Sequence, residues 1–394
     1  MNEKVKMKTG EHIMKIILFQ STTDSLNTFA KLMAEGFKQA GYDILLTDMQ
    51  NEQITRQAVQ SFTIPGKTAA LFFNHCGMNL FSEDHDIIWN RLDIDCYDLI
   101  VDHPMYYHAA IMYPIRHLTF LCVDQYHQKF IERFYHGKVR SVFFPLAGIA
   151  STGPAIPFEE RSMDLLFTGA YLIDRDIEYH TQGLSPAMKN IWLECFTMLK
   201  TNPYLTLEQA VERCFTKKGV VLPDDDLRDL VRLFQDMDGM LRSYAREHVI
   251  RTLANHDIKI HIYGEGWEYL DCKQENLVIH ERIPFDQTIP LTADAKIVLN
   301  IMPWFKAGVH DRVFTAMLNR CVCLTDSSEY MDKILTDGKN SLLYNLQTLE
   351  AIPEKLKYYI SKLNKLKQIS EQGYIDTINN HTWQSRAQQL ANII

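Results

Sequence analysis

The sequence predicts an α/β protein with two domains, each built around a parallel β-sheet. Three observations support this class. Short apolar segments alternate with amphipathic segments through the first half of the chain, a stretch rich in Gly, Pro, Ser and Thr follows at 147–157, and a second alternating series comes after it. A chain of 394 residues is also long for a single core and suits two domains of ordinary size.

The expected first domain covers residues 13–155. Its strand candidates are Lys15–Phe19, Asp43–Thr47, Ala69–Phe73, Leu99–Val101, Leu118–Val123 and Ser141–Phe144. Helical patterns at 25–39, 51–62 and 125–135 separate several of these strands, which indicates a parallel sheet covered on both faces. The residues before Met14 are polar and charged, so we expect a loose extension without a secretory signal.

The expected second domain covers residues 156–371. Its strand candidates are Leu165–Thr168, Lys259–Tyr263, Leu277–Ile279, Lys296–Ile301, Val322–Thr325 and Ser341–Tyr344. Between the first two lies a block at about 180–255 that is helical by pattern, with helices expected at 186–199, 206–214 and 224–245. This block is too long for a simple crossover, so we interpret it as a helical insertion. The last segment, 372–394, is also expected to be helical.

The most informative segment runs from Ala307 to Asp326. An apolar strand at 297–302 leads into a loop containing Gly308, and a helix follows in which Val309, Val313 and Met317 recur every four residues. The start of such a helix directs backbone N–H groups and a positive dipole end toward an anion, and Arg312 in its first turn suits a phosphate. The pattern predicts a diphosphate site. The alternative is an ordinary strand-to-helix loop in which Asp311 caps the helix and Arg312 is solvated.

At these residues the chain resembles a known family. The run Gly308-Val-His-Asp-Arg-Val-Phe, followed by Leu324-Thr-Asp326, is similar to the glycosyltransferase-1-like domain of spore-maturation-type proteins, which is the nucleotide-sugar half of a GT-B glycosyltransferase. Weaker similarity is found at 163–171, 260–264 and 381–383. The resemblance implies two Rossmann-like domains facing across a cleft, with a last helix (372–394) that crosses back to the first domain.

The same resemblance implies a function and a set of donor-binding residues. It implies transfer of a sugar from a nucleotide diphosphate, expected to be UDP, without a metal ion or other cofactor. The donor residues it implies are Gly169, Tyr263, Gly264, Gly308, His310, Asp311, Arg312 and Thr315. His310 is expected to hydrogen-bond the phosphate or the leaving oxygen, with a surface-loop histidine as the alternative.

The sequence departs from one subgroup of this family. Many retaining GT-B enzymes carry two glutamates eight positions apart around this helix, and the matching positions here are Ala307 and Thr315. A threonine hydroxyl offers a ribose no charge-assisted hydrogen bond, which is about twice as strong as a neutral one. Assignment to the retaining subgroup is therefore weakened.

Candidates for the base that deprotonates an acceptor follow the predicted strands of the first domain, where ligands of parallel sheets bind. They are His75, Asp102, His103, Asp124 and His127. The leading pair is Asp102 with His103, one residue orienting the other. The alternative is that Asp102 caps a turn set up by Pro104.

Composition excludes several other classes. A net charge of −8 without a compensating Lys/Arg run argues against nucleic-acid binding, and no segment reaches the ~18 apolar residues of a membrane span. The eight cysteines are scattered without zinc-site spacing, and Asp224-Asp-Asp226 opens a helix, so we expect no metal site and reduced thiols in the cytoplasm.

Three rival functions remain open. They are a nucleotide-sugar epimerase, a non-catalytic nucleotide-sugar-binding protein and a dinucleotide-dependent oxidoreductase. The last is disfavoured because Tyr263-Gly-Glu-Gly266 is followed by Tyr269 where the dinucleotide fingerprint needs its third glycine. The sequence does not assign the sugar, the acceptor, the stereochemical outcome or the oligomeric state.

Overall fold

The structure is a computed structural model that describes residues 14–171 and 177–394. The expected extension before Met14 and the expected domain start at residue 13 lie outside the described residues. The chain divides into two compact units. Unit 1 contains the residues up to Leu99, Tyr113–Phe120 and Gln384–Ile394, and unit 2 contains Ile100–Met112 and Leu121–Trp383. The domain boundaries expected from the sequence remain predictions.

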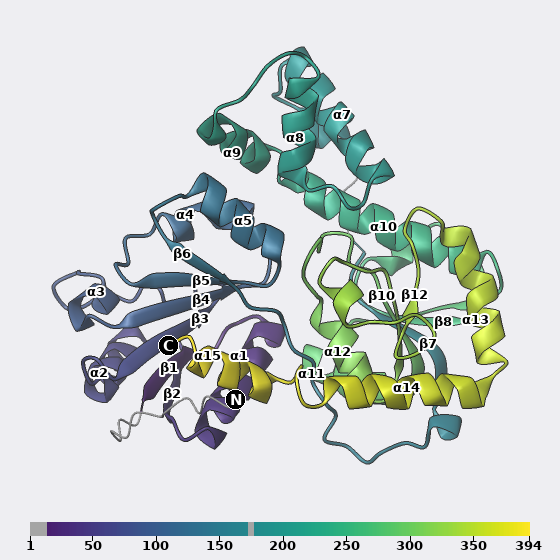
Figure 1. The fold of residues 1–394 in the computed structure, drawn as a ribbon, viewed down its shortest axis with the longest axis horizontal. Helices are drawn as coiled ribbons and strands as arrows, with labels where there is room; N and C mark the ends of the chain where they lie inside the picture. Colours follow the sequence, from purple (N-terminus) through teal and green to yellow (C-terminus); the bar gives the residue numbers. More distant parts are fainter. Residues whose placement is uncertain (1–13, 172–176) are drawn as a thin grey trace, which may run out of the picture. The chain divides into compact units, whose positions relative to one another are not determined.

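The first sheet has six strands in the order β2-β1-β3-β4-β5-β6 (Figure 1). The strands are β1 (Lys15–Phe19), β2 (Asp43–Thr47), β3 (Thr68–Phe73), β4 (Asp95–Ile100), β5 (Leu118–Cys122) and β6 (Arg140–Phe143). The intervening helices are α1 (Asp24–Gln39), α2 (Glu52–Phe62), α3 (Ile88–Leu92), the 3₁₀ turn η1 (Pro104–Tyr107), α4 (His108–Ile111) and α5 (Gln125–Phe134). β3 is buried along its whole length, as expected for a central parallel strand.

The second sheet also has six strands, in the order β12-β11-β10-β7-β8-β9. They are β7 (Met163–Thr168), β8 (Ile260–Tyr263), β9 (Leu277–His280), β10 (Ala295–Asn300), β11 (Val322–Thr325) and β12 (Leu342–Leu343). The strands of this sheet pair in parallel, and the register places Thr168 beside Tyr263 and Asn300 beside Thr325. The carboxyl ends of β7, β8 and β10 therefore meet at one edge, where a parallel sheet binds its ligands.

The helices of unit 2 include the predicted insertion. It consists of α6 (Ile177–Thr181), α7 (Pro186–Thr201), α8 (Leu207–Thr216), α9 (Asp224–Leu233) and α10 (Asp236–Ala254). Thr206 and Gln209 form a reciprocal capping box that starts α8. The single helix expected at 224–245 is wrong, because the chain breaks near Phe234 and a separate α10 continues to Ala254. Figure 1 shows α7, α8 and α9 beyond one end of α10, which runs along the second sheet.

The remaining helices of the second half are α11 (Phe285–Ala293), α12 (Asp311–Leu318), α13 (Ile352–Ile360), α14 (Leu363–Thr377) and α15 (Trp383–Ala391). The helix expected at 372–394 is interrupted, since residues 378–382 separate α14 from α15. Residues from Gln384 onward belong to unit 1.

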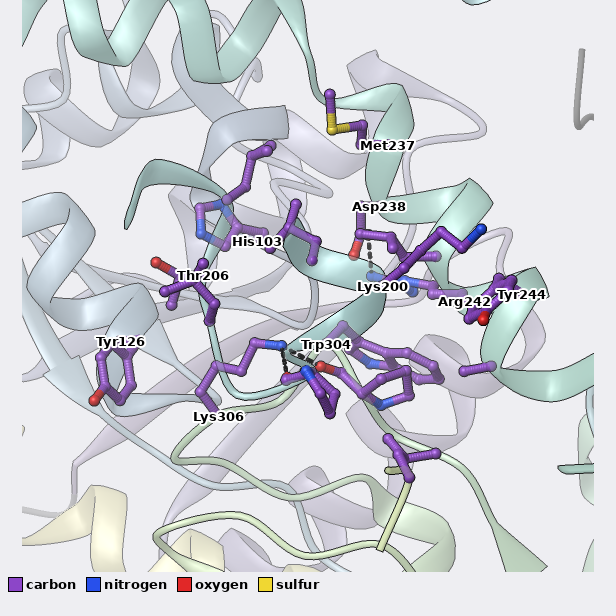
Figure 2. Close-up of a pocket in the computed structure, with 18 of the residues that line it drawn as sticks. His103, Tyr126, Lys200, Thr206, Met237, Asp238, Arg242, Tyr244, Trp304 and Lys306 are labelled. Carbon is purple, nitrogen blue, oxygen red and sulfur yellow. Dashed lines mark hydrogen bonds and ion pairs between the residues drawn. The ribbon is translucent and has the colours of Figure 1, made fainter. Parts of the chain in front are cut away.

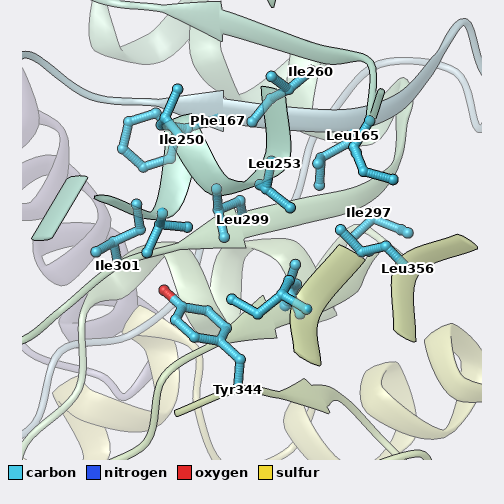
Figure 3. Close-up of a cluster of buried hydrophobic side chains, with 14 of the residues drawn as sticks. Leu165, Phe167, Ile250, Leu253, Ile260, Ile297, Leu299, Ile301, Tyr344 and Leu356 are labelled. Atoms are coloured by element: carbon cyan, nitrogen blue, oxygen red, sulfur yellow. The ribbon is translucent and has the colours of Figure 1, made fainter. Parts of the chain in front are cut away.

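The core of unit 2 fixes the position of α10 against the sheet. Phe167, Leu299 and Ile301 from the strands pack with Ile250 and Leu253 from α10, and all five are buried (Figure 3). Burying a side chain of this size contributes about 1.5–3 kcal/mol. Because α10 is held by these contacts, its polar side chains have a defined position near the carboxyl ends of β7 and β10.

Candidate functional site

Arg312 is held at the carboxyl edge of the second sheet by two hydrogen bonds. Its Nε donates to Thr168 Oγ1 at 3.1 Å and its Nη1 donates to Asn300 Oδ1 at 2.9 Å. Its Nη2 makes no hydrogen bond within the described part of the chain and lies 3.5 Å from the position that a Cβ would take on Gly169. The guanidinium is therefore fixed while one of its donor groups remains for a ligand.

Arg246 on α10 is a second guanidinium at the same place, and the sequence analysis missed it. Its Nη1 donates to the carbonyl of Ala170 at 2.5 Å, and its Nε is buried without a partner among residues 14–171 and 177–394. Burial, together with the charges of Arg312 and Arg242, lowers the pKa of Arg246 to about 9.

No carboxylate of the described residues lies within ion-pair distance of Arg246 or Arg312. Two neighbouring cations that are shielded from water and lack a counter-charge are unfavourable alone. The arrangement therefore creates an anion site beside Gly169 and Ala170.

His310 and Asp311 begin α12 next to this pair. His310 Nδ1 lies 2.9 Å from Asp311 Oδ1 and 3.2 Å from the amide nitrogen of Arg312. Burial lowers the pKa of His310. Burial alone would raise the pKa of Asp311, but His310 and Arg312 outweigh it and lower that pKa. The carboxylate of Asp311 thus interacts with His310 and Arg312, while the ring of His310 stays neutral at the start of the helix.

Three of the predicted donor residues, Gly169, Gly264 and Tyr263, form the adjoining wall. Gly264 must be glycine because an added Cβ would lie 2.1 Å from the carbonyl oxygen of Gly169. The amide of Gly169 donates to the carbonyl of Tyr263 at 2.9 Å. The ring of Tyr263 stacks on His280, with centroids 4.1 Å apart and planes 5° apart. This flat aromatic pair at the ends of β8 and β9 is suited to stacking with a planar ring.

Gly308 and Asp124 hold the loop before α12 in place. A Cβ on Gly308 would lie 2.4 Å from the carbonyl oxygen of Val123, so the glycine permits this close backbone contact. The fully buried carboxylate of Asp124 accepts from the amides of Tyr126, Lys306 and Ala307 at 2.7–2.8 Å. These bonds engage both of its oxygens, so we assign Asp124 to positioning the loop rather than to proton transfer.

Thr315, expected near a ribose, is covered by another segment. Its side-chain oxygen accepts from the amide of Ile149 at 3.1 Å, and the residue is only 3% exposed. Gly148 packs directly on the backbone of Phe314 and Thr315, where an added Cβ would lie 2.3 Å away. In this structure Thr315 therefore fastens the 148–149 segment to α12.

His75 and Asp98 form an oriented dyad within unit 1. Asp98 Oδ1 accepts from the amide of His75 at 2.9 Å, and Asp98 Oδ2 lies 2.8 Å from His75 Nδ1. Asp98 is fully buried, whereas the side chain of His75 is 28% exposed. His75 has a φ of 59°, a left-handed conformation that is uncommon for this residue type and clusters at functional sites. The bonds to Asp98 hold the ring of His75 in one orientation.

Asp102 and His103, the leading pair from the sequence, have separate partners. Asp102 accepts from Tyr107 Oη at 3.2 Å and from Arg242 Nη2 at 3.3 Å. His103 caps η1 through a hydrogen bond from the amide of Met105 to its Nδ1, at 3.1 Å. Burial and the neighbouring His127 lower the pKa of His103 well below its usual value, which keeps the ring neutral.

A pocket opens within unit 2 beside these groups. It encloses about 930 Å³, part of it open to solvent, and is lined by His103, His127, Arg242, Trp304 and Lys306 together with residues of α7 and α10 (Figure 2). The Arg242 and Arg246 guanidinium carbons lie 4.5 Å and 5.3 Å from the ring centroid of Trp304. Trp304 therefore connects the pocket with the arginine pair.

Comparisons with known proteins agree with this architecture. A profile of the glycosyl transferase-like family matches residues 242–392, which include Arg246, Trp304 and Arg312. None of the curated proteins matches the sequence.

Several solved glycosyltransferases are similar to this chain along nearly its whole length. Sucrose-phosphate synthase from Thermosynechococcus elongatus has a TM-score of 0.54 at 7% identity, covering 96% of this chain and 98% of that one. HepE of Anabaena, solved in complex with UDP-glucose, has a TM-score of 0.51 at 11% identity, covering 96% and 99%. The DNA-modifying enzyme β-glucosyltransferase has a TM-score of 0.50 at 9% identity, covering 96% and 99%.

Fold and family match together define the class that this chain resembles: its two sheets have the fold of the GT-B glycosyltransferases, and residues 242–392 match the glycosyl transferase-like family. The predicted α/β fold is confirmed by its two six-stranded sheets of Rossmann-like topology. The narrower resemblance to spore-maturation-type proteins remains a prediction. Among the helices that the structure describes, none has the length and apolar character needed to cross a bilayer.

Proposed function

We propose that the protein transfers a glycosyl group from a nucleoside-diphosphate sugar, and that Arg246 and Arg312 hold the diphosphate. The observation that carries the proposal is the pair of half-buried guanidinium groups, with no carboxylate of the described residues at ion-pair distance, beside the turn at Gly169 and Ala170. Guanidinium donors match phosphate oxygens in geometry and charge, so a diphosphate would relieve the repulsion between the two side chains.

The arginine pair and α12 would also stabilise the leaving group. During transfer, the bond between the anomeric carbon and the diphosphate oxygen breaks, and negative charge grows on that oxygen. Two fixed cations and the amino end of α12, with His310 as a further donor, oppose this charge without reorganisation. Because these groups supply the neutralising charge, we propose a reaction that proceeds without a metal ion.

Uridine is the nucleoside we propose for the donor. HepE, one of the proteins with the same fold, was solved with UDP-glucose, which supports a UDP-sugar here. The stacked rings of Tyr263 and His280 provide a flat surface for a base at the ends of β8 and β9. Within this proposal, residues 156–371 form the donor domain and residues 13–155 form the acceptor domain.

His75 is the residue that we propose as the acceptor base. Its Nδ1–H donates to Asp98, so the basic nitrogen of the neutral ring is Nε2. In the proposed reaction the acceptor oxygen forms the new bond to the anomeric carbon and its proton passes to a base, the role proposed for His75. Asp102 pairs with Arg242 and Asp124 anchors a loop, which gives these two carboxylates other roles.

Calorimetric titration with UDP tests the donor site. UDP should bind the wild type, and Arg312→Met should weaken binding at least tenfold, because a hydrogen bond to a charged group contributes about 1.5–3 kcal/mol. Arg282→Met is the matched control, since Arg282 is exposed and pairs with Glu265. Equal UDP affinities for Arg312→Met and Arg282→Met would remove Arg312 from the site. A wild type that binds neither UDP nor another nucleoside diphosphate would overturn the proposed function.

A further inference from the structure

The pocket in unit 2 has a mainly aliphatic wall that the diphosphate site does not use. Leu199 comes from α7, Leu205 precedes α8, Leu241 lies on α10, and Leu346 and Leu349 follow β12. Arg246 and Arg312 do not line this pocket, although the ring centroid of Trp304 in its wall lies 5.3 Å from the guanidinium carbon of Arg246. An apolar wall with a few polar groups is typical of a small-molecule site.

One side of the pocket holds two histidines with buried nitrogens that lack partners. His103 and His127 both line the pocket, and neither His103 Nε2 nor His127 Nδ1 makes a hydrogen bond within the described part of the chain. The two rings pack edge to face, with their centroids 4.9 Å apart. Buried polar atoms of native proteins are normally satisfied, so these atoms indicate a ligand that brings hydrogen-bonding groups. A hydroxyl both donates and accepts, and so suits a pair of neutral imidazole nitrogens.

Three cations of the described residues line the pocket, and each has a neighbour that stabilises its charge: Lys200 Nζ lies 4.4 Å from the ring centroid of Tyr244. Arg242 pairs with Asp238 at 2.7 Å and with Asp102 at 3.3 Å. Lys306 Nζ donates to the carbonyls of Pro203 and Pro303. A ligand in this pocket therefore needs no negative charge, in contrast to the ligand of the arginine pair.

We infer that this pocket binds the acceptor, and that the acceptor is a neutral amphiphile: a hydroxylated head group held by His103 and His127, joined to an apolar body against Leu199, Leu205 and Leu241. The inference deepens the proposed function and rests on it. A purely polar acceptor would lose its water along the leucine wall without gaining hydrogen bonds there, whereas an alkyl or aromatic body gains from leaving water. The helical insertion supplies Leu199, Leu205 and Leu241, so it determines which acceptors fit.

Calorimetric titration with two glucosides tests the inference. The probes are n-octyl β-D-glucoside below its micellar concentration and methyl β-D-glucoside, which share a head group and differ in the apolar body. The octyl probe should bind at least tenfold more tightly than the methyl probe. Leu241→Asn should abolish this preference, because it replaces part of the apolar wall by a side chain of similar size. Leu233→Asn is the matched control, since Leu233 is 56% exposed on α9 and lies outside the pocket.

Two further measurements separate the parts of the inference. His127→Phe should weaken binding of the octyl probe severalfold, and unchanged affinity would overturn the assignment of the head group. The affinity of each probe for the wild type should be the same with and without saturating UDP. Competition between a probe and UDP would place the nucleotide in this pocket and overturn the acceptor assignment.

The failure of the inference and the failure of the proposed function are distinguishable. Equal affinity of the two probes, with UDP binding intact, overturns the inference of an amphiphilic acceptor and leaves the proposed function standing. A wild type that binds the octyl probe but no nucleoside diphosphate overturns the proposed function, and with it the assignment of the pocket to an acceptor.

Discussion

Replacing Arg246 by methionine should stabilise the ligand-free protein while removing most of its affinity for UDP. The fall in the pKa of Arg246 from 12.5 to about 9 corresponds to roughly 5 kcal/mol of unfavourable free energy, at about 1.4 kcal/mol for each tenfold change in the acidity constant. The side chain is partly open to water, which screens its charge, and it also gives up its bond to Ala170. We therefore expect a net gain of about 1–2 kcal/mol in the free energy of unfolding.

The gain should depend on pH in a defined direction. The folded state lowers the pKa of Arg246, so the charged side chain opposes folding below about pH 9 and ceases to do so as pH rises through that value toward 12.5. The stability difference between Arg246→Met and wild type should thus be constant near neutral pH and shrink above pH 9.

Urea unfolding and UDP titration on the same preparations check both effects. UDP affinity should fall at least tenfold in Arg246→Met, from loss of a charge-assisted hydrogen bond contributing about 1.5–3 kcal/mol. Arg251→Met is the control on the same helix, because Arg251 pairs with Glu247 at 2.7 Å and lies outside the pocket. It should lose a little stability and bind UDP normally. A less stable Arg246→Met that binds UDP as well as the wild type would refute the idea of an anion site built from repelling cations.

Three other substitutions test the remaining roles. Asp98→Asn should lower the rate of UDP release during transfer by about 100-fold or more without changing UDP affinity, because a positioned base contributes typically 10²–10⁴-fold; unchanged turnover would remove His75 and Asp98 from the chemistry. Asp124→Asn should lower the free energy of unfolding in urea by about 1–3 kcal/mol, since an asparagine has one oxygen for three backbone donors; a neutral effect would contradict its anchoring role. Gly264→Ala should lower the melting temperature and weaken UDP binding, because its Cβ would lie 2.1 Å from the oxygen of Gly169; wild-type values of both would show that this contact relaxes freely.

The fold was largely predictable because its strands are short apolar segments between amphipathic helices. The pattern failed where a buried polar side chain or a helix break interrupts it. β4 was expected only from Leu99 but begins at Asp95, because Asp98 places a carboxylate inside a buried strand. That carboxylate is satisfied by the amide and ring of His75, a contact over 23 positions that no local pattern indicates. The break between α9 and α10 was likewise hidden in a continuous helical pattern.

The residues of the candidate site that are neighbours in the sequence were predictable. The residues that α10 contributes were not. Gly308 to Arg312 follow a strand and open a helix, so their position could be anticipated. Arg242 and Arg246 are four residues apart and share a helix face, a periodicity visible in the sequence. Nothing local, however, shows that this face meets Trp304 and the end of β7. The burial of Thr315 beneath Ile149 also depends on packing between distant segments.

A crystal structure of the protein with UDP bound tests the central claim most directly. The account predicts diphosphate oxygens within hydrogen-bonding distance of both Arg246 and Arg312, beside Gly169 and the first turn of α12. A nucleotide whose phosphates contact neither guanidinium would contradict it.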